Sequence, residues 1–231
     1  MRYIQKILKV KNVLLILSVV LFWGCATSYK PINPLHNLNT TMEDENVIFK
    51  YSYNVLRNAG NERYSKKEAN NYIKIVAVSI KNKSEKVIVV SENVNFYTGD
   101  KKVRLLSPEE YSHSLKQSTA GYFFYLLLSP LKLFIANGNN DSDPDIIPIG
   151  YILGPGITLL NVISASSANK KFDNELIENN IIDKTIEPGE ILNGLIAIRD
   201  IGYEPLSIKI IKEWLSSLEL IHNIKSQKNL L

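Results

Sequence analysis

The single cysteine of this 231-residue chain stands at the end of an apolar segment close to the N-terminus. The segment begins with four cationic side chains: Arg2, Lys6, Lys9 and Lys11. An apolar run, Val13 to Phe22, follows them, and Gly24 lies directly before Cys25. A cationic stretch before about 7–15 apolar residues is the pattern of a secretory signal, whereas a spanning helix needs about 20 apolar residues. The pattern separates a signal, residues 1–24, from residues 25–231, which must fold without a disulfide bond.

The residues around this cysteine resemble the lipobox of bacterial lipoproteins, in which a small residue precedes a cysteine that receives diacylglycerol. The resemblance covers Leu21-Phe22-Trp23-Gly24-Cys25. It departs from the family pattern, which prefers leucine three residues before the cysteine and a small residue two before it. A permanent signal anchor and a soluble protein cleaved near Ala26-Thr27-Ser28 are weaker alternatives. The resemblance implies that Cys25 is acylated and attaches the protein to a membrane.

Acylation of Cys25 would exclude several kinds of chemistry and partner. With no second cysteine, disulfide bonds, thiol catalysis and cysteine-bound metal ions are excluded. Four of the 27 Lys and Arg residues lie in the signal, so the remaining 23 equal the 23 Asp and Glu residues. This neutral balance predicts no nucleic-acid partner. Ala26 is not the aspartate that retains lipoproteins at the inner membrane, so the resemblance implies the periplasmic face of the outer membrane.

The chain after the signal divides into a tether and one domain. Residues 25–43 contain Pro31 and Pro34 without apolar periodicity, which predicts an extended tether. Residues 44–231 contain β-branched and aromatic runs separated by polar turns such as Thr98-Gly99-Asp100, which predict short antiparallel strands. The runs are Val47–Tyr53, Tyr72–Ile80, Lys86–Val90, Val94–Tyr97, Val103–Leu106, Thr185–Glu187, Ile191–Ile198 and Leu206–Ile211.

This pattern predicts a mainly β domain of the sandwich type. The turn Pro188-Gly189-Glu190 and the alternation from Asn193 to Ile198 resemble the closing strands of immunoglobulin-like domains in secreted bacterial proteins. The resemblance covers about 25 residues and implies a fold alone, since no Cys-Trp-Cys framework accompanies it. We expect an immunoglobulin-like antiparallel β-sandwich that is interrupted by a helical insertion at about residues 107–180.

The predicted insertion contains two segments that are almost wholly apolar. A capping box, Ser107-Pro108-Glu109-Glu110, predicts a first short helix. Ala120–Ala136 contains a single charged residue, Lys132, and Ile146–Ala168 contains none. Asn169–Asn180 has the spacing of an amphipathic helix. The two apolar segments predict a helical hairpin, residues 120–168, which we call the apolar hairpin.

Two interpretations of the apolar hairpin compete. In the favoured one, its residues pack on the sandwich and on each other, because a helix that is apolar all round must be buried or lie in a membrane. In the other, it enters the bilayer as a second anchor. Pro130 and Gly154-Pro155-Gly156 weigh against insertion, since helix breakers leave backbone groups without partners in lipid. A groove that docks another protein is a third interpretation.

The sequence predicts no catalytic residues, no cofactor and no metal ion. Asn139–Asp145 places carboxylates at alternate positions, as calcium loops do, but Ile146 and Ile152 replace the required glycine and closing glutamate. Three histidines show no catalytic spacing: His36, His113 and His222. Three glycines match no nucleotide-binding fingerprint and instead favour bends or close helix packing: Gly150, Gly154 and Gly156.

Two further features allow a binding role. Five tyrosines form a predicted aromatic patch that would bind sugar or peptide, or are simply good strand residues: Tyr51, Tyr53, Tyr64, Tyr72 and Tyr97. The C-terminal residues 212–225, with Trp214, predict a short helix that caps the domain or docks a partner.

These observations predict a lipid-anchored envelope protein that is not an enzyme. We expect a structural or accessory role in which the membrane is bound through acylated Cys25 and another envelope protein is the second partner. Two alternatives stay open. One is a carrier of a lipid or other hydrophobic ligand, and the other is a component that inserts into the membrane through residues 120–168.

Overall fold

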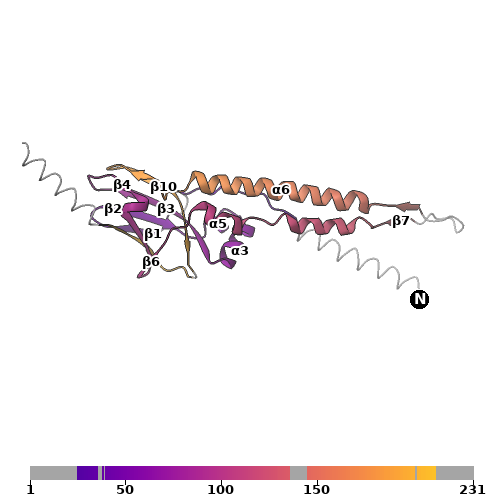
Figure 1. The fold of residues 1–231 in the computed structure, drawn as a ribbon, viewed down its shortest axis with the longest axis horizontal. Coiled ribbons are helices and arrows are strands. Elements are labelled where there is room, and N and C mark those ends of the chain that lie inside the picture. Colours follow the sequence, from indigo (N-terminus) through magenta and orange to yellow (C-terminus); the bar gives the residue numbers. More distant parts are fainter. Residues whose placement is uncertain (1–24, 36–37, 39, 136–144, 201, 212–231) are drawn as a thin grey trace, which may run out of the picture. The chain divides into compact units, whose positions relative to one another are not determined.

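The computed structural model describes residues 25–35, 38, 40–135, 145–200 and 202–211 (Figure 1). The chain divides into two compact units, each made of two separate stretches of sequence. Unit 1 is Met1–Tyr29 with Gln117–Lys171, and unit 2 is Lys30–Lys116 with Phe172–Leu231. Several small antiparallel sheets and a long helix give a mixed α+β fold. The predicted combination of β-structure with helices is confirmed at this level.

Unit 2 contains a four-stranded antiparallel sheet with the strand order β1-β2-β3-β10. Its strands are β1 (Thr40–Glu43), β2 (Val47–Ser52), β3 (Ile73–Asn82) and β10 (Ile191–Arg199). The central strand β3 pairs with β2 on one side and with β10 on the other. Residues 73–78 of β3 are all buried, including Lys74, so neither face of this part of the strand is open to solvent.

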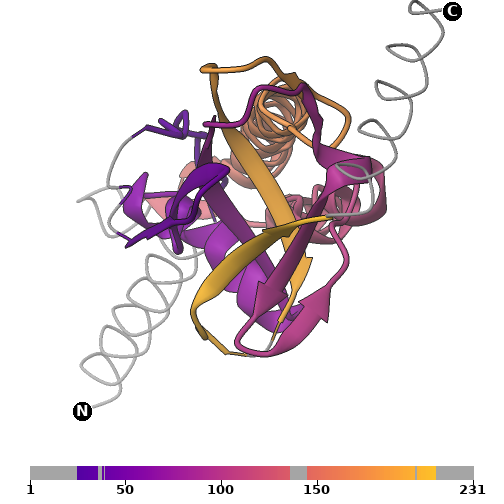
Figure 2. The same cartoon turned by 90° about the vertical axis from the view of Figure 1, so that its left-hand side faces the viewer.

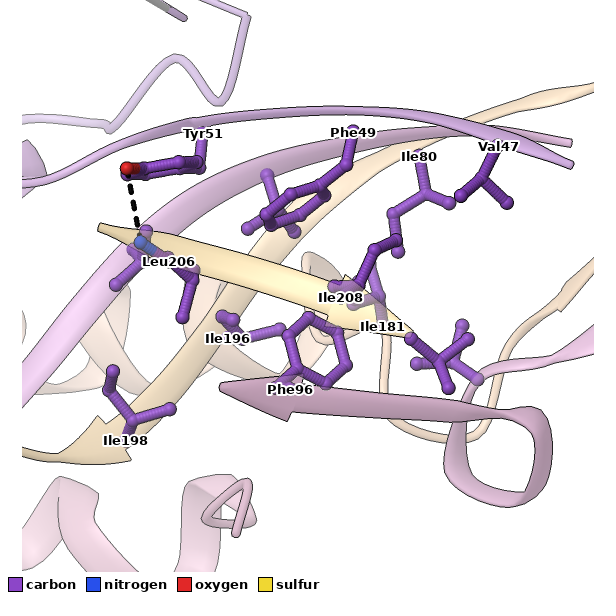
Figure 3. Close-up of a cluster of buried hydrophobic side chains, with 14 of the residues drawn as sticks. Val47, Phe49, Tyr51, Ile80, Phe96, Ile181, Ile196, Ile198, Leu206 and Ile208 are labelled. Carbon is purple, nitrogen blue, oxygen red and sulfur yellow. Dashed lines mark hydrogen bonds between the residues drawn. The ribbon is translucent and has the colours of Figure 1, made fainter. Parts of the chain in front are cut away.

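Unit 2 also contains a three-stranded antiparallel sheet (Figure 2), and its side chains contribute to the same hydrophobic core. Its strands, in the order β11-β5-β6, are β5 (Val94–Thr98), β6 (Lys101–Val103) and β11 (Leu206–Ile210). Phe49 of β2 and Phe96 of β5 meet edge to face, with ring centres 6.1 Å apart. The hydroxyl oxygen of Tyr51 accepts a 3.0 Å hydrogen bond from the backbone N–H of Leu206 (Figure 3). Strands from both sheets therefore meet in one cluster of buried side chains.

The predicted immunoglobulin-like sandwich is not shown by the described strands. In an immunoglobulin domain the first two strands share a sheet with the fourth and fifth. Here three consecutive strands, β1, β2 and β3, share a sheet with β10, and β5, β6 and β11 form another sheet. The resemblance depended on a turn and an alternation within residues 188–198. Those residues do form β10, but one strand carries no information about the order of the others.

Two small antiparallel sheets complete the strand inventory of the described chain. One pairs β4 (Ile88–Val89) with β9 (Thr185–Ile186) in unit 2. The other pairs β7 (Leu133–Ile135) with β8 (Asp145–Ile147) in unit 1. The predicted turn at residues 98–100 is confirmed, because it connects β5 to β6 and Gly99 has a φ of 54°, a conformation that favours glycine.

The short helices of unit 2 are α2 (Val55–Asn58), α3 (Glu62–Asn70), α4 (Val90–Asn93) and α5 (Pro108–Leu115). The predicted capping box at the start of α5 is confirmed, since the backbone N–H of Ser107 donates to Glu110 Oε2 at 2.8 Å. Tyr64 of α3 is buried against Phe172, with ring centres 4.6 Å apart. This contact places α3 beside the C-terminal part of the long helix that belongs to unit 2.

Residues 25–43, which the sequence predicts to be a tether, make more contacts than an extended linker would. Ile32 is buried, and its backbone N–H donates to Glu175 Oε1 at 2.5 Å. The backbone of Lys30 exchanges two hydrogen bonds with the Asn61 side chain. Residues 40–43 form β1. Composition does not predict these contacts, because the residues that stabilise the segment lie far away along the chain.

The described part of unit 1 is built mainly from the apolar hairpin (Figure 1). One arm consists of a 3₁₀ helix, η1 (Ala120–Leu128), followed by β7. The other arm consists of β8 followed by α6 (Gly150–Glu178), whose last residues belong to unit 2. The expectation that Gly154-Pro155-Gly156 interrupts the second apolar segment is wrong, because α6 continues through these residues. Pro155 lies within the first two turns of α6 and removes a single backbone hydrogen bond.

Candidate functional site

The two arms of the apolar hairpin lie side by side and approach each other closely. The hydroxyl group of Thr158 in α6 shares its proton between the backbone oxygen of Gly154 in the same helix, at 2.8 Å, and that of Tyr122 in η1, at 3.2 Å. A Cβ atom added to Gly154 would lie 3.1 Å from the backbone oxygen of Tyr125 and 2.7 Å from Ser129 Oγ. Gly150 is closer still to the backbone of the first arm, at Leu128. The predicted role of these two glycines in close packing is confirmed, whereas Gly156 has open space around it.

The first arm buries one residue in three. Tyr122 and Tyr125 are 5% and 8% exposed, and Leu128 is half-buried. A 3₁₀ helix has about three residues per turn, so side chains three positions apart share a face. The residues on the two remaining faces are large, apolar and exposed: Phe123, Phe124, Leu126 and Leu127. Phe124 and Leu127 are 73% and 74% exposed, so most of the apolar surface of η1 points outward.

The second arm buries a narrow stripe of small or polar residues. The stripe follows the period of the helix and consists of Gly150, Gly154, Thr158, Asn161, Ala165 and Ala168. The large apolar side chains of the same segment are exposed: Tyr151, Ile152, Leu153, Leu159, Leu160 and Ile163. In a helix of a water-soluble domain the large apolar residues face inward. In the part of α6 that belongs to unit 1 the arrangement is reversed, which is typical of helices that pack against each other within lipid.

Three amide side chains inside unit 1 form hydrogen bonds with the backbone. The Asn169 side chain exchanges two hydrogen bonds with the backbone of Gln117, at 2.8 and 2.9 Å. The Gln117 side chain does the same with the backbone of Thr27, at 3.2 and 2.8 Å. Asn161 Oδ1 accepts a 2.6 Å hydrogen bond from the backbone N–H of Ala26. These bonds hold residues 26 and 27 against the hairpin.

Cys25, the predicted lipidation site, is exposed and is the first residue that the structure describes. An exposed thiol at this position agrees with a signal that ends at residue 24. The sequence did not indicate where in the fold Cys25 lies. The hydrogen bond from its neighbour Ala26 to Asn161 places it beside the second arm of the hairpin.

The expectation that packing buries the apolar hairpin is not met in the described arms. Of the described chain, α6 is the one helix that is long and apolar enough to cross a membrane. Only 28% of its most apolar 18-residue window is buried. A core helix of a soluble protein would be mostly buried, so this exposure needs another explanation. The periodicity of the sequence could not predict which side chains are exposed, because a segment that is apolar on every face has no preferred side.

The remaining predicted ligand-like residues do not converge. His113 is exposed on α5, and the acidic cluster at 139–145 lies outside the described residues except for Asp145, the first residue of β8. His36, His222 and the tail at 212–225 also lie outside them. Within the described residues no group of three or more His, Cys, Asp and Glu side chains is arranged to hold a metal ion.

Unit 2 contains a polar cavity that the sequence did not predict. It has a volume of about 370 Å³ and is lined by residues from α2, α3, β3 and the segment before β11. Glu68 is 5% exposed, and its Oε1 accepts a 2.7 Å hydrogen bond from the backbone N–H of Ile75. Burial raises the pKa of the Glu68 carboxyl to about 7. A buried carboxyl group with a raised pKa beside a cavity is a feature of binding sites.

The cation beside this carboxyl is Lys74, which is 6% exposed. Its Nζ lies 3.8 Å from the centre of the Tyr203 ring, a cation–π contact. The Tyr203 hydroxyl group donates to Asn54 Oδ1 at 2.9 Å. Asn54 has a φ of 60°, so the tight backbone turn before α2 carries one of the residues that line the cavity. Nothing in the local sequence around these residues indicated that they would meet.

The predicted tyrosine patch forms only in part. Tyr51 and Tyr53 pack edge to face, and Tyr53 packs in the same way on Tyr203, each pair with ring centres 5.5 Å apart. Tyr64 instead packs against Phe172, and the Tyr97 ring lies under Lys209. Tyr72 is 60% exposed and has a φ of 53°, which is unusual for an aromatic residue. The predicted patch missed Tyr203, which joins through a contact across about 150 positions.

No protein-family model matches the chain, and searches of curated proteins and of solved structures gave no significant match.

Proposed function

We propose that this protein is a lipid-anchored protein of the cell envelope whose apolar hairpin enters the lipid bilayer. The reversed arrangement of α6 carries the proposal: its small and polar residues such as Thr158 and Asn161 lie inside, while large apolar residues such as Leu160 lie outside. Without a hydrophobic driving force in lipid, helices associate through small residues and interhelical hydrogen bonds, and they direct large apolar side chains at the lipid.

The free energy of leaving these side chains in water supports the same conclusion. Moving one large apolar side chain fully out of water contributes about 1.5–3 kcal/mol. The two arms expose fifteen such side chains, from Phe123 to Ile163. Because they are only partly exposed, the total is on the order of 10 kcal/mol, which is comparable with the whole stability of a domain, about 5–15 kcal/mol. A surface of this kind requires an apolar phase to cover it.

The distribution of the exposed side chains favours a bilayer over a protein partner. At 100° per residue, the positions from Tyr151 to Ile163 that are exposed and apolar cover roughly 200° of the circumference of α6. Two faces of η1 add to this surface. A protein that docks on a helix covers a single stripe at i, i+3, i+4 and i+7. Lipid covers every side that the partner arm leaves free.

In this proposal unit 2 has a non-catalytic, accessory role and contacts another envelope protein. The lipobox resemblance supports attachment through acylated Cys25, and Ala26 supports the periplasmic face of the outer membrane. The carrier alternative receives less support. The cavity beside Glu68 is lined mainly by charged and polar side chains, including Arg57, Glu62 and Lys74, and this lining does not suit an acyl chain.

Membrane fractionation with alkaline carbonate extraction tests the proposal. Wild type is compared with a Cys25→Ala variant that is exported by a substituted cleavable signal. We expect the variant to stay in the membrane pellet, because the hairpin is a second anchor. Release of the variant into the soluble fraction would mean that acyl chains are the only anchor and that the hairpin stays outside the bilayer.

A matched control separates insertion from aggregation, which also sediments. Three outward side chains are replaced together in the Cys25→Ala background: Phe124→Ser, Leu127→Ser and Leu160→Ser. All three positions are exposed, so the contacts between the arms are kept. We expect this variant to become extractable by carbonate. If the triple variant sediments as the Cys25→Ala protein does in a lysate from which the membranes have been removed, the pellet contains aggregated protein and the insertion proposal is wrong.

A further inference from the structure

The exterior of both hairpin arms changes at one level, from polar or small residues to large apolar residues. On α6, the exposed residues up to Ile163 are apolar, whereas the exposed residues after it include Ser164, Ser166, Ser167, Lys170 and Lys171. On the first arm, Ser118, Ala120 and Gly121 are exposed before the large apolar residues begin at Phe123. We call this level, residues 119–122 with 161–164, the collar.

Hydrogen bonds keep the two arms in register at the collar. Thr158 is bonded to Tyr122, and Asn169 is bonded to Gln117, so the change occurs between these two levels in both arms. The coincidence does not follow from the sequence spacing, because the two changes lie about 40 positions apart. One plane through unit 1 therefore separates a part whose exposed residues are polar or small from a part whose exposed residues are large and apolar.

A third, independent feature lies at the same level. Ala26 donates to Asn161, and it packs against the cluster formed by Tyr122, Tyr125 and Ala165. Cys25, the exposed residue before Ala26, is thus held at the collar by a segment that is distant in sequence from both arms. Diacylglycerol on a lipoprotein cysteine places that cysteine at the membrane surface.

From this coincidence we infer that the collar lies at the surface of the bilayer and that the acyl chains of Cys25 enter the lipid beside α6. This inference rests on the proposed function. The segment of α6 from Asn161 to Gly150 is about 16 Å long at 1.5 Å per residue. That length matches one leaflet of a hydrocarbon core about 30 Å thick. The small β7–β8 sheet extends the apolar surface beyond this depth.

The inference accounts for three lysines of unit 1: Lys132, Lys170 and Lys171. Lys170 and Lys171 stand on the polar side of the collar, where an ammonium group remains in water or contacts lipid headgroups. Two charged residues lie in the described stretches 122–135 and 145–163: Lys132, next to β7, and Asp145, the first residue of β8. Lys132 is exposed, and its four-carbon stem lets the ammonium group reach toward a polar surface.

Cysteine accessibility in isolated, sonicated envelope membranes tests the inference. Acylation occupies the Cys25 sulfur, so an introduced cysteine is the reactive thiol. Four single variants at exposed positions cross the collar: Ile152→Cys, Leu160→Cys, Ser167→Cys and Lys171→Cys. Each is treated with a membrane-impermeant maleimide before and after solubilisation in detergent, with wild type as the background control.

We expect Ser167→Cys and Lys171→Cys to label equally in both conditions, and Ile152→Cys and Leu160→Cys to label at least tenfold less in the membrane than in detergent. Equal labelling of all four in the membrane would overturn the proposed function itself. Two other outcomes would leave the insertion of the hairpin standing and overturn only the position of the collar. One is protection of Ile152→Cys together with full labelling of Leu160→Cys, and the other is protection of Ser167→Cys.

Discussion

The backbone N–H of Ala26 donates a 2.6 Å hydrogen bond to Oδ1 of Asn161, which lies 135 positions further along the chain. The Asn161 Nδ2 group donates to the backbone oxygen of Ile157 at 2.9 Å, so both ends of this side chain are bonded. The residue is 6% exposed. This single side chain connects the N-terminal segment that carries Cys25 to the helix that exposes the apolar surface.

Replacing Asn161 by alanine is expected to loosen the N-terminal segment. The substitution leaves the Ala26 N–H group without its acceptor, which costs about 1–3 kcal/mol when the group stays buried. The measurement is the rate of proteolysis within residues 25–30 of the detergent-solubilised protein, which should rise several-fold. Ser164→Ala, at an exposed position of the same helix, is the control and should leave the rate unchanged. Equal rates in both variants would contradict the assigned role.

Gly154 and Gly156 form a matched pair for testing the close approach of the hairpin arms. A Cβ at position 154 would press on Ser129 and on the backbone of Tyr125, whereas a Cβ at position 156 meets nothing within 4 Å. We expect Gly154→Ala to destabilise the hairpin by about 1–3 kcal/mol through overpacking. Gly156→Ala should be neutral or stabilising by about 0.5–1 kcal/mol, because alanine favours the helix. Thermal unfolding in detergent compares them, and a reversed order would refute the packing of the arms.

Glu68 is expected to make the stability of unit 2 depend on pH. Burial raises the carboxyl pKa from 4.5 to about 7. Below about pH 4.5 the group is protonated in the folded and unfolded chains alike. Between about pH 4.5 and 7 the unfolded chain releases a proton that the folded chain keeps, so the free energy of unfolding falls as pH rises, by about 3 kcal/mol in total.

Glu68→Gln removes this titration while keeping an oxygen for the Ile75 N–H group. Urea unfolding at pH 5 and at pH 7.5 should show a smaller loss of stability with pH in the variant than in wild type. Glu62→Gln, at an exposed position of α3, is the control and should behave as wild type does. An unchanged pH dependence in Glu68→Gln would show that the group does not titrate in this range.

Tyr203 is expected to stabilise the wall of the polar cavity through its ring and its hydroxyl group. Tyr203→Phe loses the hydrogen bond to Asn54, which costs about 0.5–1.5 kcal/mol. Tyr203→Leu also loses the contact with Lys74 and the edge-to-face contact with Tyr53, so its cost should be larger by about 1–2 kcal/mol. Urea unfolding at one pH measures the difference. Equal costs for the two variants would mean that the ring contacts contribute nothing.

Much of the local structure was predictable from short stretches of sequence. The capping box at Ser107 predicted the start of α5, and Thr98-Gly99-Asp100 predicted the turn between β5 and β6. Each depends on residues within four positions of one another. The polar cavity was not predictable, because Glu68, Lys74 and Tyr203 each look ordinary in their own segments. Their combination depends on a contact across about 130 positions, and a raised carboxyl pKa has no signature in the sequence.

The apolar hairpin shows what the sequence alone determines and what only the tertiary structure determines. The absence of charge from residues 146–168 is a property of composition, so the sequence alone determined that this segment would avoid water. It did not determine what covers the segment. A segment that is apolar on every face has no preferred side, and the side is chosen by the partner that packs against it. Only the tertiary structure decided that Gly154, Thr158 and Asn161 face inward, and that the large side chains and Cys25 are left at the surface.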